Sequence, residues 1–137
     1  MTKLSGYSGT PLAKKLGIAA GSKLVTRNAP SDYEQLVAPL PPGVLISGKV
    51  TKSTDLVHVF AVDRSVLERE LASLRQTIRS DSVVWVSWPK KASKVPTSIS
   101  EDTIREVCLP LGFVDIKVCA VNSIWSGLKL MIRKELR

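Results

Sequence analysis

Apolar residues in this chain gather in short runs, and the length of each run predicts a strand. Leu56–Val62 and Val83–Trp88 are almost continuously apolar, which is typical of central strands that are covered on both faces. Shorter runs predict two further strands, Lys23–Arg27 and Val44–Ser47. These four segments are expected to form most of one sheet.

The last part of the chain predicts a β-hairpin. Val114–Val121 and Leu128–Arg133 alternate apolar and polar residues more clearly, a pattern that favours strands. The turn-like segment Asn122–Gly127 lies between them. We therefore expect the two strands to pair antiparallel.

Two helices are predicted after the third and fourth strands. The earlier one carries a single apolar stripe at helical spacing and starts at Ser65, which is followed three residues later by a glutamate in capping-box spacing. The stripe consists of Leu67, Leu71, Leu74 and Ile78. The later helix starts at Ser100, a serine cap followed by two acids that favour the helix dipole.

Two shorter helices are predicted in the first third of the chain. Thr10 and Pro11 resemble an N-cap with proline at the first helical position, and Gly17 is expected to end this helix as its C-cap. Ser31 followed by Glu34 has capping-box spacing and predicts the second helix.

The alternation of strands and helices predicts one α/β domain over residues 1–137, with helices on both faces of a mostly parallel sheet and a C-terminal antiparallel hairpin. Only eight residues, 48–55, join the second strand to the third, whereas a parallel crossover usually takes about a dozen or more. The second strand is therefore either a poorly formed edge or antiparallel to its neighbour.

Charge adds a hint about the partner. The formal net charge is +8, and the first 31 residues hold five basic residues and no acid. Such a balance favours an anionic partner, with nucleic acid or a phosphorylated molecule first, although a basic surface without a dedicated ligand is the alternative. The two cysteines, Cys108 and Cys119, lack metal-site spacing and are expected to be reduced, buried thiols. No metal site is expected.

The sequence also predicts where the chain resides. No apolar run approaches the length of about eighteen residues that spans a bilayer, and the N-terminus lacks an apolar signal region. We therefore expect a cytoplasmic protein with no membrane partner.

A ligand site is expected at the carboxyl ends of the strands, where open α/β sheets bind their ligands. Amides, a carboxylate, tryptophans and lysines follow the predicted strand ends. The candidate residues are Asn28, Asp63, Trp88, Lys90, Lys91, Lys94, Asn122 and Trp125. A tryptophan beside lysines can stack a base or sugar while the ammonium groups hold phosphates. In the alternative interpretation, each tryptophan belongs to the core and the lysines lie on a solvated loop.

A second anion site is a hypothesis at the start of the first helix. There Thr10, Lys14 and Lys15 would surround backbone amides that can hold a phosphate. A simple cover for the edge of the sheet is the equally plain alternative.

Two stretches, Gly6–Gly17 and Trp85–Lys94, resemble a family of small, mostly bacterial proteins classed as a domain of unknown function. The predicted topology is similar to Rossmann-like class I methyltransferases with a shortened first half, in which one strand–helix unit is missing. Those enzymes have a glycine-rich turn after the first strand and an acid after the second. Here the corresponding segments are Arg27–Pro30 and Ser47–Gly48, so no S-adenosylmethionine, NAD or other cofactor is expected.

Catalytic constellations are also missing from the sequence. Gly6–Gly9 is not a nucleophile elbow, because that motif needs the pattern GxSxG between a strand and a helix. His58 lies between two valines in a strand and is interpreted as a packed, hydrogen-bonded core residue rather than a base. Asp63 either acts as a base or leads into the next helix, and the second interpretation is favoured.

These patterns favour a non-catalytic binding module for an anionic ligand, with single-stranded nucleic acid as the most testable candidate. The alternative is a regulatory or protein-interaction subunit that keeps a methyltransferase-like shape without activity. An enzyme that acts on a phosphorylated small molecule, with Asp63 or His58 as its base, is the third hypothesis.

Overall fold

The computed structural model describes residues 9–137 and confirms the predicted order of helices and strands. The first residues of the Gly6–Gly17 stretch lie outside the described residues. The strands are β1 (Lys23–Arg27), β2 (Leu45–Ser47), β3 (Leu56–Phe60), β4 (Val83–Pro89), β5 (Phe113–Ala120) and β6 (Trp125–Ile132). The helices are α1 (Leu12–Leu16), α2 (Tyr33–Val37), α3 (Arg64–Thr77) and α4 (Glu101–Leu111), with short 3₁₀ turns at Lys91–Ser93 and Lys134–Leu136.

The six strands form one sheet in the order β2-β1-β3-β4-β6-β5. The pairs among β1, β2, β3 and β4 are parallel, and β6 is antiparallel to both β4 and β5. The predicted C-terminal hairpin is therefore confirmed. Its second strand is inserted between β4 and β5, which leaves β5 as one edge of the sheet.

The second strand is the poorly formed edge that the short connection predicts, and the antiparallel alternative is wrong. β2 has three residues and pairs parallel with the first half of β1. Because β2 is so short, the chain returns only about 10 Å along the sheet to the start of β3, a distance that eight extended residues span easily. Val50 of this connection packs against the core beneath the sheet.

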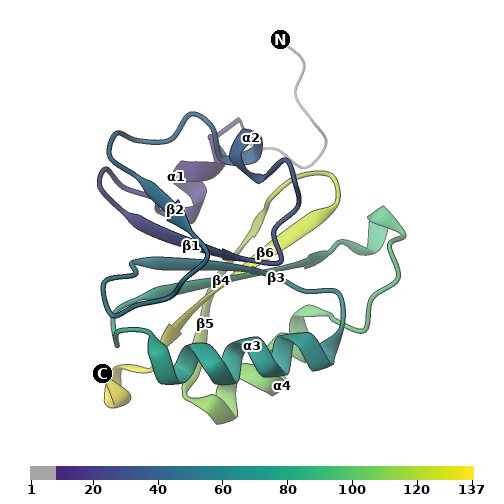
Figure 1. The fold of residues 1–137 in the computed structure, drawn as a ribbon. Coiled ribbons are helices and arrows are strands. Elements are labelled where there is room, and N and C mark those ends of the chain that lie inside the picture. Colours follow the sequence, from purple (N-terminus) through teal and green to yellow (C-terminus); the bar gives the residue numbers. More distant parts are fainter. Residues whose placement is uncertain (1–8) are drawn as a thin grey trace.

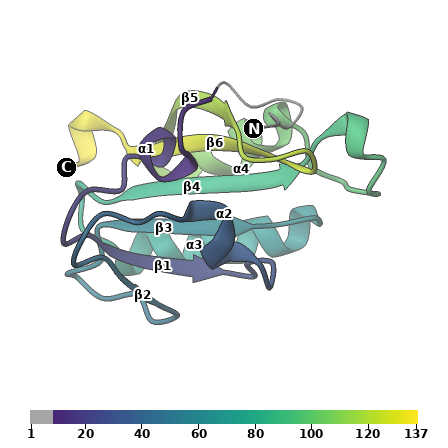
Figure 2. The same ribbon diagram turned by 90° about the horizontal axis from the view of Figure 1, so that it is seen from above.

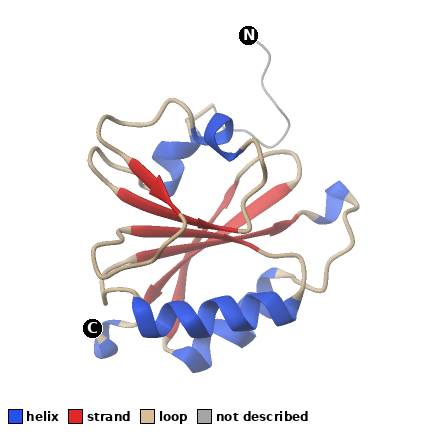
Figure 3. Ribbon diagram, viewed as in Figure 1, coloured by secondary structure: helices blue, strands red, loops and turns tan. Residues whose placement is uncertain are grey.

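Helices cover both faces of the sheet, as predicted (Figures 1 and 3). The short helices α1 and α2 lie on one face, which we call the α1/α2 face, and the longer α3 and α4 lie on the other, the α3/α4 face. Seen from above, α1 lies over β4 and the hairpin strands (Figure 2). The molecule thus has three layers.

Alternation along β3 divides the core in two. Val57 and Val59 pack against the leucine stripe of α3, while Leu56 and Phe60 pack with α1 and α2. All five residues of β3 are buried, which confirms a central strand covered on both faces. The α3 stripe is likewise confirmed, since each of its four members is buried.

Only one of the predicted helix starts has the predicted chemistry. Ser100 caps α4, and its hydroxyl and that of Thr103 complete a capping box. By contrast, α3 begins at Arg64, so Ser65 lies inside the first turn, and the hydroxyl of Ser98 accepts the N–H of Arg64 instead. A hydroxyl from a neighbouring loop has replaced the local cap.

The two short helices also begin differently from the prediction. The N-cap position of α1 is Pro11 rather than Thr10, and that of α2 is Asp32 rather than Ser31, with no side-chain cap at either. Gly17 does end α1 in the left-handed conformation, with φ of 81°. These five-residue helices depend on packing for their position rather than on caps.

Candidate functional site

The turn after β1 is closed by Asn28. This residue adopts a left-handed conformation, with φ of 59°, which asparagine tolerates better than most residues other than glycine. Its side-chain amide donates to the carbonyl of Phe60 at 3.3 Å and to a carboxylate oxygen of Glu70 at 3.4 Å. Asn28 therefore ties the ends of β1 and β3 to α3, and its amide is already engaged.

The two predicted tryptophans lie on opposite faces of the sheet. Trp88 is 8% exposed and packs in the core of the α3/α4 face. Trp125 is half-buried on the α1/α2 face, where it meets the ring of Phe60 edge-on at a centroid distance of 5.0 Å. The predicted joint stacking platform is therefore not formed, and Trp88 has the core position of the alternative interpretation.

Asn122 builds the hairpin turn. Its side-chain oxygen accepts the backbone N–H groups of Ile124 at 2.9 Å and Trp125 at 2.8 Å. Asp63 is exposed and occupies the N-cap position of α3, without a side-chain cap bond. The favoured interpretation of Asp63 as the lead into a helix therefore matches its position.

The three loop lysines lie on a well-defined segment after β4, which extends beyond the sheet (Figure 1). The backbone N–H of Lys90 donates to the carbonyl of Ile124 at 2.7 Å, which joins the loop to the hairpin turn. The hydroxyl of Ser93 donates to the carbonyl of Lys90 at 2.6 Å. Lys91 and Lys94 are exposed and Lys90 is half-buried.

The anion site at the start of α1 stays a prediction. Lys14 and Lys15 lie in the last turn of this five-residue helix. The ammonium of Lys15 reaches the carbonyl of Ala120 at 3.4 Å, on β5.

His58 is fully buried and hydrogen-bonded through both ring nitrogens, as the sequence predicts. Nδ1 lies 2.9 Å from the hydroxyl of Tyr33, and Nε2 lies 2.7 Å from the hydroxyl of Ser87. Burial lowers the pKa of His58 to about 3 and raises that of Tyr33. The imidazole is therefore neutral at physiological pH, and with no exposed surface it cannot contact a substrate.

The two cysteines are thiols, one fully buried and one half-buried. Cys108 lies within α4, where burial raises its pKa to about 11. Cys119 lies on β5, and burial raises its pKa although Lys15 and Lys117 oppose the shift. Neither thiol is a strong nucleophile at neutral pH. Residues 9–137 contain no cluster of side chains suited to a metal ion.

Arginines and lysines have different surroundings. Every ion pair between two residues of the described range 9–137 uses an arginine, and the arginines concerned are Arg27, Arg64, Arg79, Arg105 and Arg133. Arg105 alone contacts three carboxylates, those of Glu101, Asp102 and Asp115. The lysines of the described range form none of these ion pairs, so their charge is not neutralised by a carboxylate of the same range.

Sequence reasoning missed one pair of these lysines. Lys117 of β5 lies directly opposite Lys129 of β6. Counting outward from the hairpin turn could have indicated this pair, because the register is continuous from Ala120 opposite Ser126 to Lys117 opposite Lys129. A bulge between Asp115 and Lys117 shifts the register only beyond this pair.

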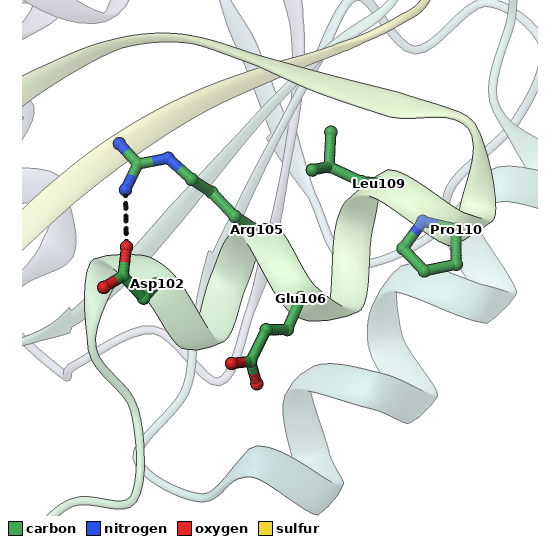
Figure 4. Close-up of a pocket in the computed structure, with 5 residues that line it drawn as sticks. All are labelled: Asp102, Arg105, Glu106, Leu109 and Pro110. Atoms are coloured by element: carbon green, nitrogen blue, oxygen red, sulfur yellow. Dashed lines mark hydrogen bonds and ion pairs between the residues drawn. The ribbon is translucent and has the colours of Figure 1, made fainter.

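A shallow hollow of about 450 Å³ lies on the outer surface of α4 (Figure 4). It is lined by Asp102, Arg105, Glu106, Leu109 and Pro110. Exposed apolar side chains lie on the same helix and on the neighbouring edge strand, namely Leu109, Ile116 and Val118, with exposed fractions of 40%, 47% and 49%. This surface lies on α4 and β5 rather than at the predicted strand-end site.

The residues at the strand ends do not fit S-adenosylmethionine. The side chain of Asn28 occupies the turn after β1, and Pro30 offers no N–H. β2 ends at Ser47 without an acid that could hold a ribose.

No helix among the described residues is both long enough and apolar enough to cross a membrane.

Comparison with known proteins shows the fold. No family model matches the chain, and no curated protein matches it either. Among solved structures, the chain is similar to a SAM-dependent methyltransferase from Aquifex aeolicus, with a TM-score of 0.61 and 10% identity over 89% of this chain and 88% of that one. The sheet is therefore a class I methyltransferase-like Rossmann fold, mostly parallel with an antiparallel C-terminal pair.

Two further matches are longer than this chain. The pyocyanin biosynthetic protein PhzM has a TM-score of 0.65 and 10% identity over 89% of this chain and 53% of its own. A possible exported protein from Bordetella parapertussis has a TM-score of 0.62 and 8% identity over 88% of this chain and 64% of its own. The chain thus spans less than two thirds of either protein.

Proposed function

We propose that this protein is a non-catalytic, methyltransferase-like module that binds an anionic ligand, with single-stranded nucleic acid as the leading candidate. The observation that carries the proposal is the loop after β4. Lys90, Lys91 and Lys94 form no ion pair with any residue of 9–137, whereas the carboxylates of Glu68, Glu101 and Glu106 pair with arginines. Unpaired ammonium groups on one loop provide the electrostatic attraction that phosphate backbones need.

The loop is ordered before any ligand arrives. Hydrogen bonds from Lys90 to Ile124, from Ser93 to Lys90 and from Lys94 to Lys91 fix its backbone. A ligand therefore does not have to order this backbone, and that saves conformational entropy on binding. Lysines bind phosphates as point charges and do not require fork-like geometry, so sequence-independent binding is expected.

The test is a fluorescence-anisotropy titration with a labelled, mixed-sequence single strand, at salt concentrations of about 50 and 200 mM. Lys90→Glu combined with Lys91→Glu should reduce affinity at least about tenfold, because two phosphate contacts become repulsive. Lys23→Glu combined with Lys49→Glu is the matched control, since both residues are exposed, one at the start of β1 and one in the segment between β2 and β3. Equal affinity of the loop variant and the control would refute the proposal.

A protein-interaction role is the second candidate, favoured by the hollow on α4 (Figure 4). Its lining combines Leu109 and Pro110 with Asp102, Arg105 and Glu106, and both carboxylates are ion-paired with arginines. The partner that fits is a protein segment with an apolar centre and a polar rim. The subunit would then keep a methyltransferase-like shape without the activity.

Different substitutions distinguish nucleic-acid binding from the protein-interaction role. Leu109→Lys should abolish a stoichiometric complex with a purified partner, whereas the Lys90 and Lys91 substitutions should leave that complex intact. Retention of the partner by Leu109→Lys would exclude this surface. A complex that dissociates with salt as steeply as nucleic-acid binding would also count against it.

Membership of the uncharacterised, mostly bacterial family belongs to the same proposal. It is supported by the stretches Gly6–Gly17 and Trp85–Lys94, and the second of these contains β4 and its basic loop. A cytoplasmic location is proposed with it, because a module for intracellular nucleic acid has to share that compartment.

A further inference from the structure

A second basic surface lies on the hairpin. Lys117 and Lys129 are directly opposite each other on β5 and β6, so their side chains share one face of the sheet. That face is the α1/α2 face, because Leu128 and Leu130 on either side of Lys129 belong to the other core. Like charges directly opposite each other destabilise a strand pair.

A third lysine approaches the same face from α1. The ammonium of Lys15 reaches the carbonyl of Ala120 on β5. Lys15 and Lys117 both act electrostatically on the thiol of Cys119, so both lie in its neighbourhood. Lys129 is opposite Lys117, and three basic side chains from three different elements therefore lie on this part of the face.

The backbones of β5 and β6 pack closely against their surroundings at Gly127. A side chain at Gly127, which pairs with Cys119, would place its Cβ 3.3 Å from the ring of Trp85 and 3.5 Å from the sulfur of Cys119. Glycine thus lets the β6 backbone lie close to both groups. Lys117 and Lys129 are therefore presented by a closely packed pair of strands.

The hairpin strands offer these lysines no carboxylate on the same face. Asp115, the only acid on β5 or β6, points to the α3/α4 face, where it accepts from Arg105 at 2.9 Å. Neither Lys117 nor Lys129 forms an ion pair within the described range. The repulsion between them is therefore not relieved by an acid among residues 9–137.

We propose that Lys15, Lys117 and Lys129 form a binding surface for phosphate groups, separate from the loop after β4. An anion placed between the opposed ammonium groups removes their repulsion, which is the physical reason for an anion to bind here. Compact phosphate groups fit this chemistry, because lysines hold them as point charges. The phosphates come either from a nucleic-acid backbone or from a free oligophosphate.

The surface rests on its own observations and not on the loop lysines. Trp125 lies opposite Pro89 at the start of the loop, and Lys129 lies four residues further along β6. Trp125 and Lys129 are therefore about 14 Å apart at the usual rise of a strand. A single-stranded nucleic acid can contact both surfaces, whereas a short oligophosphate can occupy only one.

The experiment uses two probes, inorganic tripolyphosphate by calorimetry and a labelled single strand of about 16 nucleotides by anisotropy. The variant is Lys117→Gln with Lys129→Gln, and the matched control is Lys23→Gln with Lys49→Gln, which removes the same charge. We expect the hairpin variant to bind tripolyphosphate about tenfold more weakly than the control. For the single strand, the slope of log K against log salt should fall by about 1.4, because two phosphate contacts are lost.

The outcomes distinguish this surface from the loop. Loss of tripolyphosphate binding in the hairpin variant supports the surface even if substitutions in the loop have no effect. Loss of the salt slope alone identifies the nucleic-acid backbone as the source of the phosphates. If the hairpin variant and the control bind both probes equally, the inference is wrong, whatever the loop variants do. Failure of the wild type to bind either probe at low salt overturns it as well.

The melting temperature of the hairpin variant tests whether weaker binding is caused by unfolding. Removal of the opposed charges should leave the melting temperature unchanged or raise it. Amine-reactive labelling gives an independent readout, since tripolyphosphate should protect Lys117 and Lys129 but not Lys23 or Lys49. Equal protection of all four lysines would contradict a local site.

Discussion

The two faces of the sheet are built in different ways. On the α3/α4 face, helices of 14 and 11 residues cover a core of mostly leucine, valine and isoleucine with two aromatic residues, Trp88 and Phe113. On the α1/α2 face, two helices of five residues cover a core that contains a hydrogen-bonded histidine, a tyrosine and a tryptophan. Long helices can be positioned by the apolar area that they bury, whereas short helices bury less and need directional contacts such as hydrogen bonds.

The directional contacts are on β3 and β4. Nε1 of Trp85 donates to the carbonyl of Leu16 at 2.9 Å, which fixes the end of α1. The hydroxyl of Tyr33 meets His58, which fixes α2. Each short helix is thus held by one buried hydrogen bond to the sheet. The difference indicates that stability resides mainly on the α3/α4 face, while the α1/α2 face depends on a few polar groups.

The largest predicted effect breaks the α3/α4 face. Leu71→Ala should lower the free energy of unfolding by about 2–5 kcal/mol, because Leu71 is fully buried in the middle of α3 and the cavity cannot collapse completely. Denaturant unfolding measures the change. Ser73→Ala on the exposed side of the same helix is the control and should stay within about 0.5 kcal/mol of the wild type. A loss below about 1 kcal/mol for Leu71→Ala would contradict the comparison.

On the other face, removal of the central histidine should have a somewhat smaller effect. His58→Leu leaves the hydroxyls of Tyr33 and Ser87 buried without their partner, and should cost about 2–3 kcal/mol. The triple variant with Tyr33→Phe and Ser87→Ala removes those hydroxyls as well. It should recover part of the loss, because an apolar replacement of a whole network is cheaper than a broken one. No recovery would show that shape rather than hydrogen bonding dominates.

Acid should act on the α1/α2 face through the same residue. His58 has a pKa of about 3 in the folded protein and about 6.5 when unfolded, so between these values the unfolded chain binds the additional proton. Stability therefore falls as the pH is lowered, by about 2 kcal/mol from this residue between pH 7 and pH 5. Urea unfolding of the wild type and of His58→Leu should show this difference in pH dependence. Parallel pH profiles would mean that His58 does not titrate as its burial implies.

Periodicity predicted the order of strands and helices, because a buried strand and an amphipathic helix each leave a repeating pattern. The leucine stripe of α3 and the continuous apolar run of β4 are examples. The capping serines at 31 and 65 were misleading, since N–H groups at helix starts can find partners from distant loops, as Arg64 does with Ser98. Local spacing cannot show such a partner.

The candidate site was harder to predict. Trp88 and Trp125 both lie at the expected edge, but the face to which each ring points depends on register. The pairing of Lys117 with Lys129 joins two strands across the hairpin, and the contact of His58 with Ser87 joins residues 29 positions apart. These features follow from tertiary pairing and not from any pattern within one segment. The sequence thus indicated the end of the sheet at which these residues lie, but not the face to which each side chain points.

The smallest predicted effect sharpens the comparison on the α1/α2 face. Lys117→Glu replaces a like pair across β5 and β6 with an opposite pair facing Lys129. It should raise the free energy of unfolding by about 0.2–1 kcal/mol and weaken the binding of phosphate groups at the same time. Thermal melts at low salt and about 1 M salt measure the first effect, because screening should remove most of the gain. If stability rises while phosphate binding weakens, the lysine pair lowers the stability of the hairpin and contributes to binding. If Lys117→Glu is destabilising at both salt concentrations, the repulsion assigned to this pair is wrong.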